Sequence, residues 1–370
     1  MSWLSFVFNS IIVVTVTIIA DAFVVSRISS SSIHLTDHKI NRNFASWSQY
    51  AEFDPCGDIL AVRSAGVDGY NLASPREWLE YSERKCGCGA YTVVRCDFLP
   101  NTSSWRVWEK DFHWKRLSDS YRDLIDDYDA DCEDAINRTE MLLSTLLTSC
   151  QRTLLSPGTT FPRDSCCTGM ITMLWQIEED RCSVRGHVFT TAVFSNPIYY
   201  DPQSISASLA MVPTPNRFEN KPRSKLSSWC SKRRPLEDQF KIANDSEVLL
   251  TREDDNGNRD ILEGLTSNLF VLYRNATLRT PADGVLEGCA RNLVLHHAQL
   301  MGYSVDCCPV TLGSVGDWEE VFCTSSIRLI TPVSKVVDGK NGRTIWQGSS
   351  KPRKWRKLYE FILADSSGKL

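Results

Sequence analysis

Residues 261–333 hold two features that could together bind an anionic cofactor. Gly288 comes just before a predicted helix, from about Cys289 to Met301, whose apolar residues recur at helical spacing. A glycine at a helix start lets backbone N–H groups approach an anion closely, and the helix dipole favours negative charge there. Glu263 ends a predicted strand, where its carboxylate could be buried near that helix start. Each feature alone is also common in proteins that bind no ligand.

Four short motifs follow one another along this stretch. They are Glu263-Gly264-Leu-Thr-Ser-Asn268-Leu-Phe270, Thr280-Pro281, Leu286-Glu-Gly288-Cys-Ala-Arg291, and Val321-Phe-Cys-Thr-Ser-Ser326 continuing to Pro332-Val333. Their order resembles that of the fold-type IV (class IV) pyridoxal-phosphate-dependent aminotransferases, a family that includes branched-chain and D-amino-acid aminotransferases and aminodeoxychorismate lyase. The resemblance implies an α/β (α+β) fold with a small α/β domain and a larger pseudo-barrel domain. It also implies pyridoxal 5′-phosphate as the cofactor.

An enzyme of this kind needs a lysine that forms a Schiff base with the cofactor aldehyde. Lys221, Lys225, Lys232 and Lys241 all lie near the predicted connection between the domains, and composition does not choose among them. The family pattern has an aromatic residue four positions after the lysine, and Trp229 meets it for Lys225. The resemblance therefore implies Lys225 as the catalytic residue and the point of cofactor attachment.

The resemblance also assigns the other contacts of the cofactor. Glu263 would pair with the pyridine nitrogen, while Arg116, the helix start and Ser326 would hold the phosphate; a guanidinium fork suits a pair of phosphate oxygens. Tyr91 and Arg95, in a predicted strand over residues 89–95, are candidate substrate contacts. The full cofactor-binding set is Lys225, Glu263, Arg116, Gly288, Cys289, Ala290, Ser326, Thr266 and Ser267.

These assignments predict an aminotransferase that acts on an amino acid and a 2-oxo acid. One alternative is an aminodeoxychorismate lyase, which would give 4-aminobenzoate and pyruvate with the same cofactor and motifs. A second is a non-catalytic relative that keeps the fold as a binding protein. A homodimer is expected, because relatives complete the pocket across a two-fold interface.

Bulk properties fit a globular enzyme of two domains. The chain has 370 residues, of which 42% are hydrophobic and 23% charged, and its net charge of −4 gives no reason to expect a nucleic-acid partner. None of its 14 cysteines forms the CxxC pairs typical of zinc sites, so no metal is expected. We expect reduced cysteines in the interior of the enzyme.

The N-terminal residues are predicted to be targeting segments. Residues 1–22 contain an apolar run too short for a comfortable membrane span and end in Ala20-Asp-Ala22, which is typical of a signal-peptide cleavage site. Residues 23–50 are rich in Ser and poor in acids, as in a transit peptide. Together they predict plastid targeting and no stable membrane span in the mature protein. A secreted protein and a membrane-anchored one are the alternatives.

The remaining chain divides into two predicted domains. The small α/β domain covers 51–215 and the large cofactor-binding domain 216–370, with a proline-containing connection over 196–224. Within the small domain, β-formers and apolar spacing predict strands and helices. The strands are expected at 89–95, 104–108, 169–176 and 185–195, and the helices from about 111 and over 141–155.

Overall fold

The computed structural model describes eleven segments of the chain, all within the compact unit Ala45–Leu370. They are 47–53, 59–64, 75–99, 103–154, 167–177, 184–194, 204–211, 223–243, 246–253, 257–348 and 354–366. The signal-like segment and most of the transit-like segment lie outside these residues. The last residues of the expected transit segment, from Trp47, form the start of a strand.

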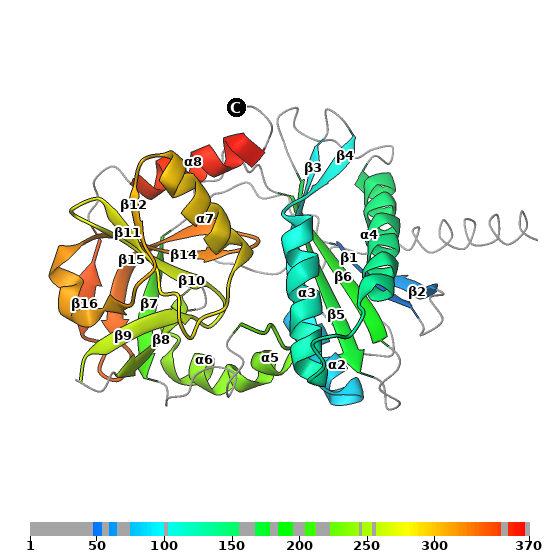
Figure 1. The fold of residues 1–370 in the computed structure, drawn as a ribbon, viewed down its shortest axis with the longest axis horizontal. Helices are drawn as coiled ribbons and strands as arrows, with labels where there is room; N and C mark the ends of the chain where they lie inside the picture. Colours follow the sequence, from blue (N-terminus) through cyan, green and yellow to red (C-terminus); the bar gives the residue numbers. More distant parts are fainter. Residues whose placement is uncertain are drawn as a thin grey trace, which may run out of the picture. The chain divides into compact units, whose positions relative to one another are not determined.

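The small domain is built on a sheet of six antiparallel strands (Figure 1). Helices α3 (Lys110–Ile125) and α4 (Glu133–Leu154) cover one face, where Val94, Leu117 and Ile171 are buried together. Side chains of successive residues in a strand point to opposite faces of the sheet. Tyr91 and Leu174 lie on the other face, under α2 (Pro75–Cys86). The strand order is β2 (Ile59–Ser64), β1 (Trp47–Phe53), β6 (Val184–Phe194), β5 (Cys167–Ile177), β3 (Gly89–Leu99), β4 (Ser104–Val107).

The large domain is a ten-stranded sheet that closes on itself. Strand β7 (Ile205–Met211) runs parallel to both of its neighbours, β8 (Glu247–Glu253) and β15 (Leu329–Asp338). Strand β11 (Thr277–Arg279) runs parallel to β12 (Ser304–Asp306), and the other strand pairs are antiparallel. The closing contact joins β9 to β10 at Glu263 and Asn268. The order is β12 (Ser304–Asp306), β11 (Thr277–Arg279), β10 (Asn268–Tyr273), β14 (Trp318–Ser325), β15 (Leu329–Asp338), β7 (Ile205–Met211), β8 (Glu247–Glu253), β9 (Arg259–Gly264), β13 (Val310–Thr311), with β16 (Thr344–Gln347) beside β15.

The closed sheet has an apolar interior and helices on its outside (Figure 1). Inside, Leu209, Leu249 and Val271 belong to one buried cluster, and a short 3-10 helix, η2 (Leu312–Asp317), packs beside it. Outside, α7 (Cys289–Leu300) and α8 (Lys354–Ser366) cover β10 and β14, while α5 (Ser228–Lys232) and α6 (Arg234–Phe240) pack beside β8. The two-domain fold with a barrel-like sheet expected from the motifs is confirmed.

Most predicted elements are found close to their expected bounds. The strand predicted over 89–95 is β3, and the helix predicted from Cys289 is α7, which ends just before Gly302 with a φ of +80°. A glycine favours that left-handed conformation at a helix end. Strand β7, however, pairs with β8 and β15 in the large sheet, so this sheet begins before the expected start of the large domain at residue 216.

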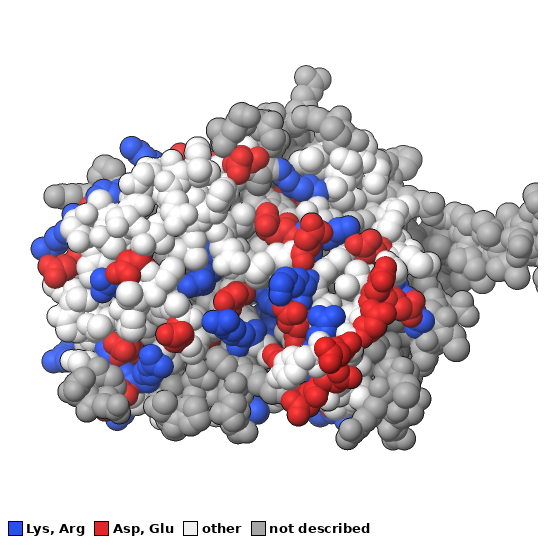
Figure 2. All heavy atoms as spheres, viewed as in Figure 1, with Lys and Arg blue, Asp and Glu red and all other residues white. Residues whose placement is uncertain are grey.

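The acid-rich segment between α3 and α4 is a solvated connection. Asp126, Asp127, Asp129 and Asp131 are exposed, and Figure 2 shows acidic side chains gathered over this side of the molecule. Asp131 accepts a hydrogen bond from the backbone N–H of Glu133, the first residue of α4. This bond satisfies one of the donors that a helix start leaves unpaired.

The described residues contain no helix long and apolar enough to cross a membrane.

Removing the Phe270 ring should destabilise the large domain. Phe270 is fully buried and stacks on Phe322 with ring centroids 5.2 Å apart, under α7 and α8. We expect Phe270→Ala to lower the free energy of unfolding by about 3–5 kcal/mol, because the cavity left behind is only partly refilled. Urea unfolding measures the change, and Tyr128→Ala, at a position that is 64% exposed, is the control. Equal midpoints for the two variants would contradict the packing.

Candidate active site

Glu263 is a buried acid with two protein donors at the closing point of the barrel. Glu263 is only 2% exposed to solvent. The Asn268 side-chain amide donates to Glu263 Oε2 at 3.3 Å, and the backbone N–H of Leu286 donates to the same oxygen at 3.2 Å. A buried carboxylate needs such donors, because water no longer solvates it. The acid therefore faces the loop that leads into α7.

Asn268 and Gly288 fix the start of α7 against this acid. Asn268 Nδ2 also donates to the Leu286 carbonyl at 2.6 Å. A Cβ atom on Gly288 would lie 2.1 Å from Asn268 Oδ1, which is closer than any real contact. A Cβ atom here would displace the Asn268 amide or shift the start of α7, so the glycine preserves the contacts that join Glu263, Asn268 and the loop before α7.

Two further motif residues hold the loop that precedes α7. The Thr280 hydroxyl donates to the Leu269 carbonyl at 2.7 Å, and Arg291 Nη2 donates to the Pro281 carbonyl at 3.0 Å. Both side chains are buried. Thr280 and Arg291 therefore hold β10, the loop and α7 together, which is a structural reason for their presence in the motifs beside Glu263 and Gly288.

Arg116 and His113 form a buried polar group on α3. Arg116 is 7% exposed, and its Nη2 donates to the Thr92 hydroxyl at 2.7 Å and contacts His113 Nδ1 at 3.2 Å. His113 Nδ1 lies 2.8 Å from the same hydroxyl, and its Nε2 is buried without a hydrogen-bond partner among the described residues. Burial, together with the positive charges of Arg116 and Lys225, holds the pKa of His113 well below its ordinary value. The ring is therefore neutral near pH 7.

The segment that carries Lys225 is pinned to the edge of β3. Its backbone N–H donates to the Ser120 hydroxyl of α3 at 3.0 Å, and its carbonyl accepts from the Tyr91 N–H at 2.9 Å. Ala90 and Leu226 form an antiparallel bridge beside it. The half-buried Lys225 side chain places its Nζ 4.7 Å from the centroid of the Tyr91 ring. A cation–π contact of this kind helps to hold the side chain in place.

Arg116 connects this group to the start of α7. Its guanidinium opposes the effect of burial on the pKa of the Cys289 thiol, which burial nevertheless raises to about 12. Cys289 is thus a neutral thiol at the first position of α7 and adds no negative charge there. The charge of Arg116 thus acts on both His113 and Cys289, and that of Lys225 acts on His113. Glu263 is bonded to the backbone of Leu286, three residues before Cys289.

A family model described as amino-transferase class IV matches residues 89–336. The chain belongs to the class IV aminotransferases. The cofactor of this family is pyridoxal 5′-phosphate, and the residues present fit it: the chain has a buried acid bonded to the loop before a glycine-initiated helix, and a buried arginine.

Solved structures of class IV aminotransferases share the fold. CpuTA1, a fold IV-transaminase from Curtobacterium pusillum, has a TM-score of 0.60 at 15% identity, with 87% of this chain and 99% of that chain covered. The branched-chain aminotransferase of Thermoproteus uzoniensis has a TM-score of 0.58 at 17% identity, covering 87% and 96%. A hypothetical aminotransferase from Mycobacterium tuberculosis, in a PLP-bound form, has a TM-score of 0.58 at 15% identity, covering 87% and 100%. A comparison with curated proteins found no match.

Arg95, a candidate substrate contact of this class IV chain, has its charge neutralised inside the protein. It is 4% exposed, and its Nε donates to Asp97 Oδ1 at 3.0 Å. Trp108 Nε1 donates to Asp97 Oδ2 at 2.7 Å, while Arg95 Nη1 donates to the carbonyl of Ile327 at 2.8 Å. In this arrangement Arg95 connects the small domain to the turn between β14 and β15.

The other predicted residues differ in how they are held. Tyr91 is 4% exposed and packs with Trp78 and Leu79 of α2, besides its contact with Lys225. Ser326 is half-buried in the turn that Arg95 holds. Thr266 and Ser267 donate their hydroxyl protons to Glu247 Oε2, at 2.9 and 2.7 Å. The backbone N–H of Ala290, by contrast, lies at the free start of α7 with those of Gly288 and Cys289.

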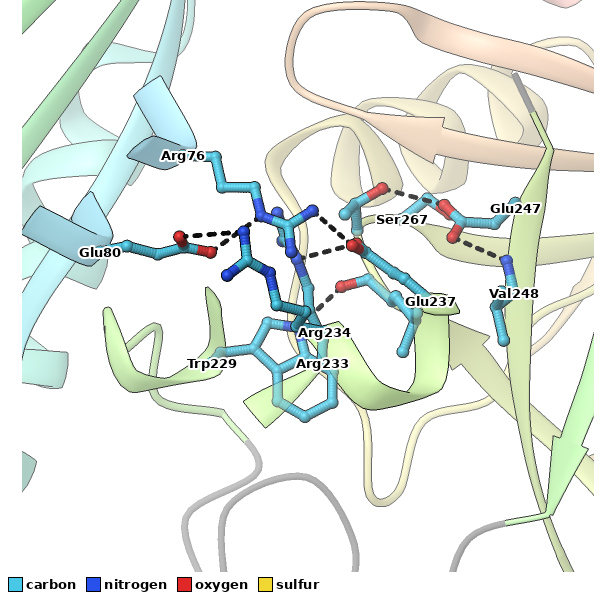
Figure 3. Close-up of polar contacts among 11 residues, drawn as sticks. Arg76, Glu80, Trp229, Arg233, Arg234, Glu237, Glu247, Val248 and Ser267 are labelled. Atoms are coloured by element: carbon cyan, nitrogen blue, oxygen red, sulfur yellow. Dashed lines mark hydrogen bonds and ion pairs between the residues drawn. The ribbon is translucent and has the colours of Figure 1, made fainter. Parts of the chain in front are cut away.

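An ionic network ties α2 to the helices that follow Lys225 (Figure 3). Arg76 of α2 bonds both Glu80 and Glu237, which is on α6. Arg233 pairs with Glu237 at 3.1 Å, and Arg234 with Glu80 at 3.5 Å. Since Trp229 Nε1 donates to the Leu265 carbonyl at 2.7 Å, the aromatic residue that follows Lys225 anchors α5 to the large domain.

Three residues of the site were not assigned a role from the sequence. His113 could have been found, because residues three apart lie on one face of a helix and His113 therefore neighbours Arg116. Asp97 could have been found beside Arg95, because residues two apart share a face of a strand. Thr92 carries no sequence signal that separates it from other strand threonines.

A methyl group at position 288 should weaken cofactor binding. The Cβ of Gly288→Ala would collide with Asn268 Oδ1, and the start of α7 would have to move away from Glu263. We expect the affinity for pyridoxal phosphate to fall at least about tenfold, or about 1.4 kcal/mol. Absorbance titration measures it. Gly316→Ala, where a Cβ meets nothing within 4 Å, is the matched control and should bind as the unchanged protein does.

Stability should fall below about pH 6.5, in part because of His113. The folded protein keeps this ring neutral, whereas the unfolded chain binds a proton below the ordinary pKa of 6.5. Unfolding then takes up a proton, so the free energy of unfolding decreases by up to about 1.4 kcal/mol per pH unit as the pH drops.

His113→Gln should remove the part of the acid-induced loss of stability that His113 causes. Urea unfolding at about pH 7.5 and about pH 5.5 would show it as a smaller loss of stability on acidification in the variant. An equal loss in both proteins would mean that His113 is protonated in the folded state.

Proposed function

We propose that the protein is a pyridoxal-phosphate-dependent aminotransferase that moves an amino group between an amino acid and a 2-oxo acid. The observation that supports it best is the buried Glu263, which Asn268 and the Leu286 N–H hold beside the loop into the glycine-initiated helix α7. The Lys225 segment, held against β3 and α3, and the buried Arg116 of α3 add to it. Structures with the same fold add support. They include branched-chain aminotransferases, one with norvaline and one complexed with N-(5′-phosphopyridoxyl)-L-glutamate.

Lys225 is proposed as the attachment point and as the proton carrier. Bound pyridoxal phosphate supplies an electron sink for the negative charge that develops at the substrate Cα. The Lys225 amine would take the proton from the substrate Cα and return it at the former aldehyde carbon of the cofactor, two bonds away across the nitrogen. Its backbone, held by Tyr91 and Ser120, keeps the amine beside the small-domain sheet.

Glu263 and the phosphate ligands are proposed to orient the cofactor. The Glu263 carboxylate would hold a proton on the pyridine nitrogen; Asn268 and Leu286 donate to one of its oxygens, Oε2. Arg116, with Ser326 and the N–H groups of Cys289 and Ala290, would bind the phosphate. The neutral forms of His113 and Cys289 leave Arg116 and the helix dipole to set the local charge.

The protein is also proposed to be a homodimer. The support is the family resemblance, because relatives complete their pockets across a two-fold interface. Sedimentation equilibrium measures the state, and a monomer at assay concentrations would contradict it.

Plastid targeting is proposed from the sequence alone. It is supported by the signal-like residues 1–22 and the acid-poor, Ser-rich residues 23–50. Sequencing the N-terminus of the mature protein tests it, because a mature chain that retains residues 1–22 would exclude cleavage.

A substrate panel separates the two reactions that the shared motifs allow. The purified protein is incubated with a set of amino acids plus 2-oxoglutarate, and separately with aminodeoxychorismate. We expect a 2-oxo acid to form only in the first set. Release of 4-aminobenzoate and pyruvate in the second would establish the lyase instead.

Lys225→Ala should abolish covalent attachment of the cofactor. Borohydride reduction followed by mass measurement should show the added mass on the unchanged protein and not on the variant. Transaminase turnover should fall by at least about a thousandfold, because the group that moves the proton is lost.

Lys232→Ala, an exposed lysine on α5, is the matched control and should keep both the added mass and the turnover. If the unchanged protein takes up no pyridoxal phosphate at all, the chain is a non-catalytic relative.

A further inference from the structure

A polar cavity at one end of the barrel contains two basic residues, Lys241 and Arg328, to which no role has so far been assigned. It has a volume of about 80 Å³. In the same measure a single water needs about 10–15 Å³, so there is room for several waters or for a short organic molecule. Its lining residues are Ile205, Glu237, Lys241, Ser246, Glu247, Val248, Leu265, Thr266 and Arg328.

Both acids in the wall already have donors (Figure 3). Figure 3 shows Arg76 reaching Glu237, which Arg233 also pairs with at 3.1 Å. Glu247 accepts the hydroxyls of Thr266 and Ser267 on one oxygen and the Val248 N–H, at 3.0 Å, on the other. With their lone pairs directed at these donors, the two carboxylates are poor ligands for a further cation.

The two basic residues in the wall have no ion-pair partner among the described residues, whereas both acids have donors within the protein. These basic residues, Lys241 and Arg328, are both exposed. Lys241 follows α6, while Arg328 ends the turn whose Ile327 carbonyl is held by Arg95. The charge that remains open in the cavity is therefore positive, on two side chains that come from separate elements.

The rest of the wall favours an organic anion over an inorganic one. Ile205, Val248 and Leu265 also line the cavity, and although they are largely buried they give its mainly polar wall a small apolar part, against which a short carbon chain can lie. An arginine fork and an ammonium are the usual partners of a carboxylate. We propose that this cavity binds a short organic carboxylate, of the size of propionate or succinate, between Lys241 and Arg328.

The proposal does not depend on the proposed function. Neither Lys241 nor Arg328 is among the residues assigned to the cofactor, so binding can be measured whatever the reaction is. The cavity does adjoin the assigned residues, because Thr266 lines it and Arg328 is two residues after Ser326. The carboxylate could thus belong to a substrate or to a separate effector, and the experiment distinguishes these.

The test is calorimetric titration of the full-length protein with succinate, propionate and inorganic phosphate. The unchanged protein should bind at least one of the carboxylates more tightly than phosphate. Lys241→Gln and Arg328→Gln should each weaken carboxylate binding at least about tenfold, and the double variant should abolish it. Lys232→Gln and Arg274→Gln, both exposed and outside the cavity, are matched controls that should bind as the unchanged protein does.

Two results would overturn the proposal. One is carboxylate affinity that stays the same in Lys241→Gln and Arg328→Gln, and the other is an unchanged protein that binds neither carboxylate or prefers phosphate. Borohydride-fixed cofactor is measured on every variant, so that failure of cofactor attachment is seen separately from failure of this site.

A kinetic arm identifies the source of the carboxylate. If the cavity holds part of a substrate, Arg328→Gln raises KM for dicarboxylic 2-oxo acids and leaves KM for monocarboxylic ones unchanged. If it holds an effector, added succinate changes the turnover of the unchanged protein and not that of Arg328→Gln.

Discussion

The buried carboxylate of Glu263 is the interaction on which the large domain depends. A carboxyl group with 2% exposure needs hydrogen-bond donors from the protein, and two come from separate elements, Asn268 on β10 and the backbone of Leu286 before α7. The same Asn268 closes the barrel by pairing with Glu263 in the sheet. One polar cluster thereby joins the closing strands to the loop that leads into α7.

The small domain uses a buried ion pair for a similar purpose. Arg95 and Asp97 lie within one strand, where removing either partner would leave the other as an uncompensated buried charge, at a cost of about 3–5 kcal/mol. The pair extends through Arg95 Nη1 to the Ile327 carbonyl, so the turn that contains Ser326 is positioned by the small domain. A charge that would suit a substrate carboxylate is used in this protein for connecting the two sheets.

Some charged side chains around the helices that follow Lys225 have hydrogen-bond or ion-pair partners within the protein, and others have no ion-pair partner among the described residues. Glu80, Glu237 and Glu247 each have two or more donors, and they hold α2, α6 and the 265–267 turn in place. Lys241 and Arg328 have no such partners among the described residues. The acids therefore hold these elements together, whereas Lys241 and Arg328 leave positive charge in the cavity that a ligand could pair with.

The sequence by itself determined the family and most of the elements, and it singled out the motif residues around Glu263 and Gly288. Gly288, Asn268, Thr280 and Arg291 are close in the chain to the groups that they hold, so local spacing carries the information. Tertiary structure alone decided which side chains far apart in sequence pair with one another. Nothing in the chain order shows that Arg95 reaches Ile327, that Arg76 reaches Glu237, or that β7 joins the large sheet. These contacts arise between segments far apart in sequence, where folding brings together groups whose burial makes pairing obligatory.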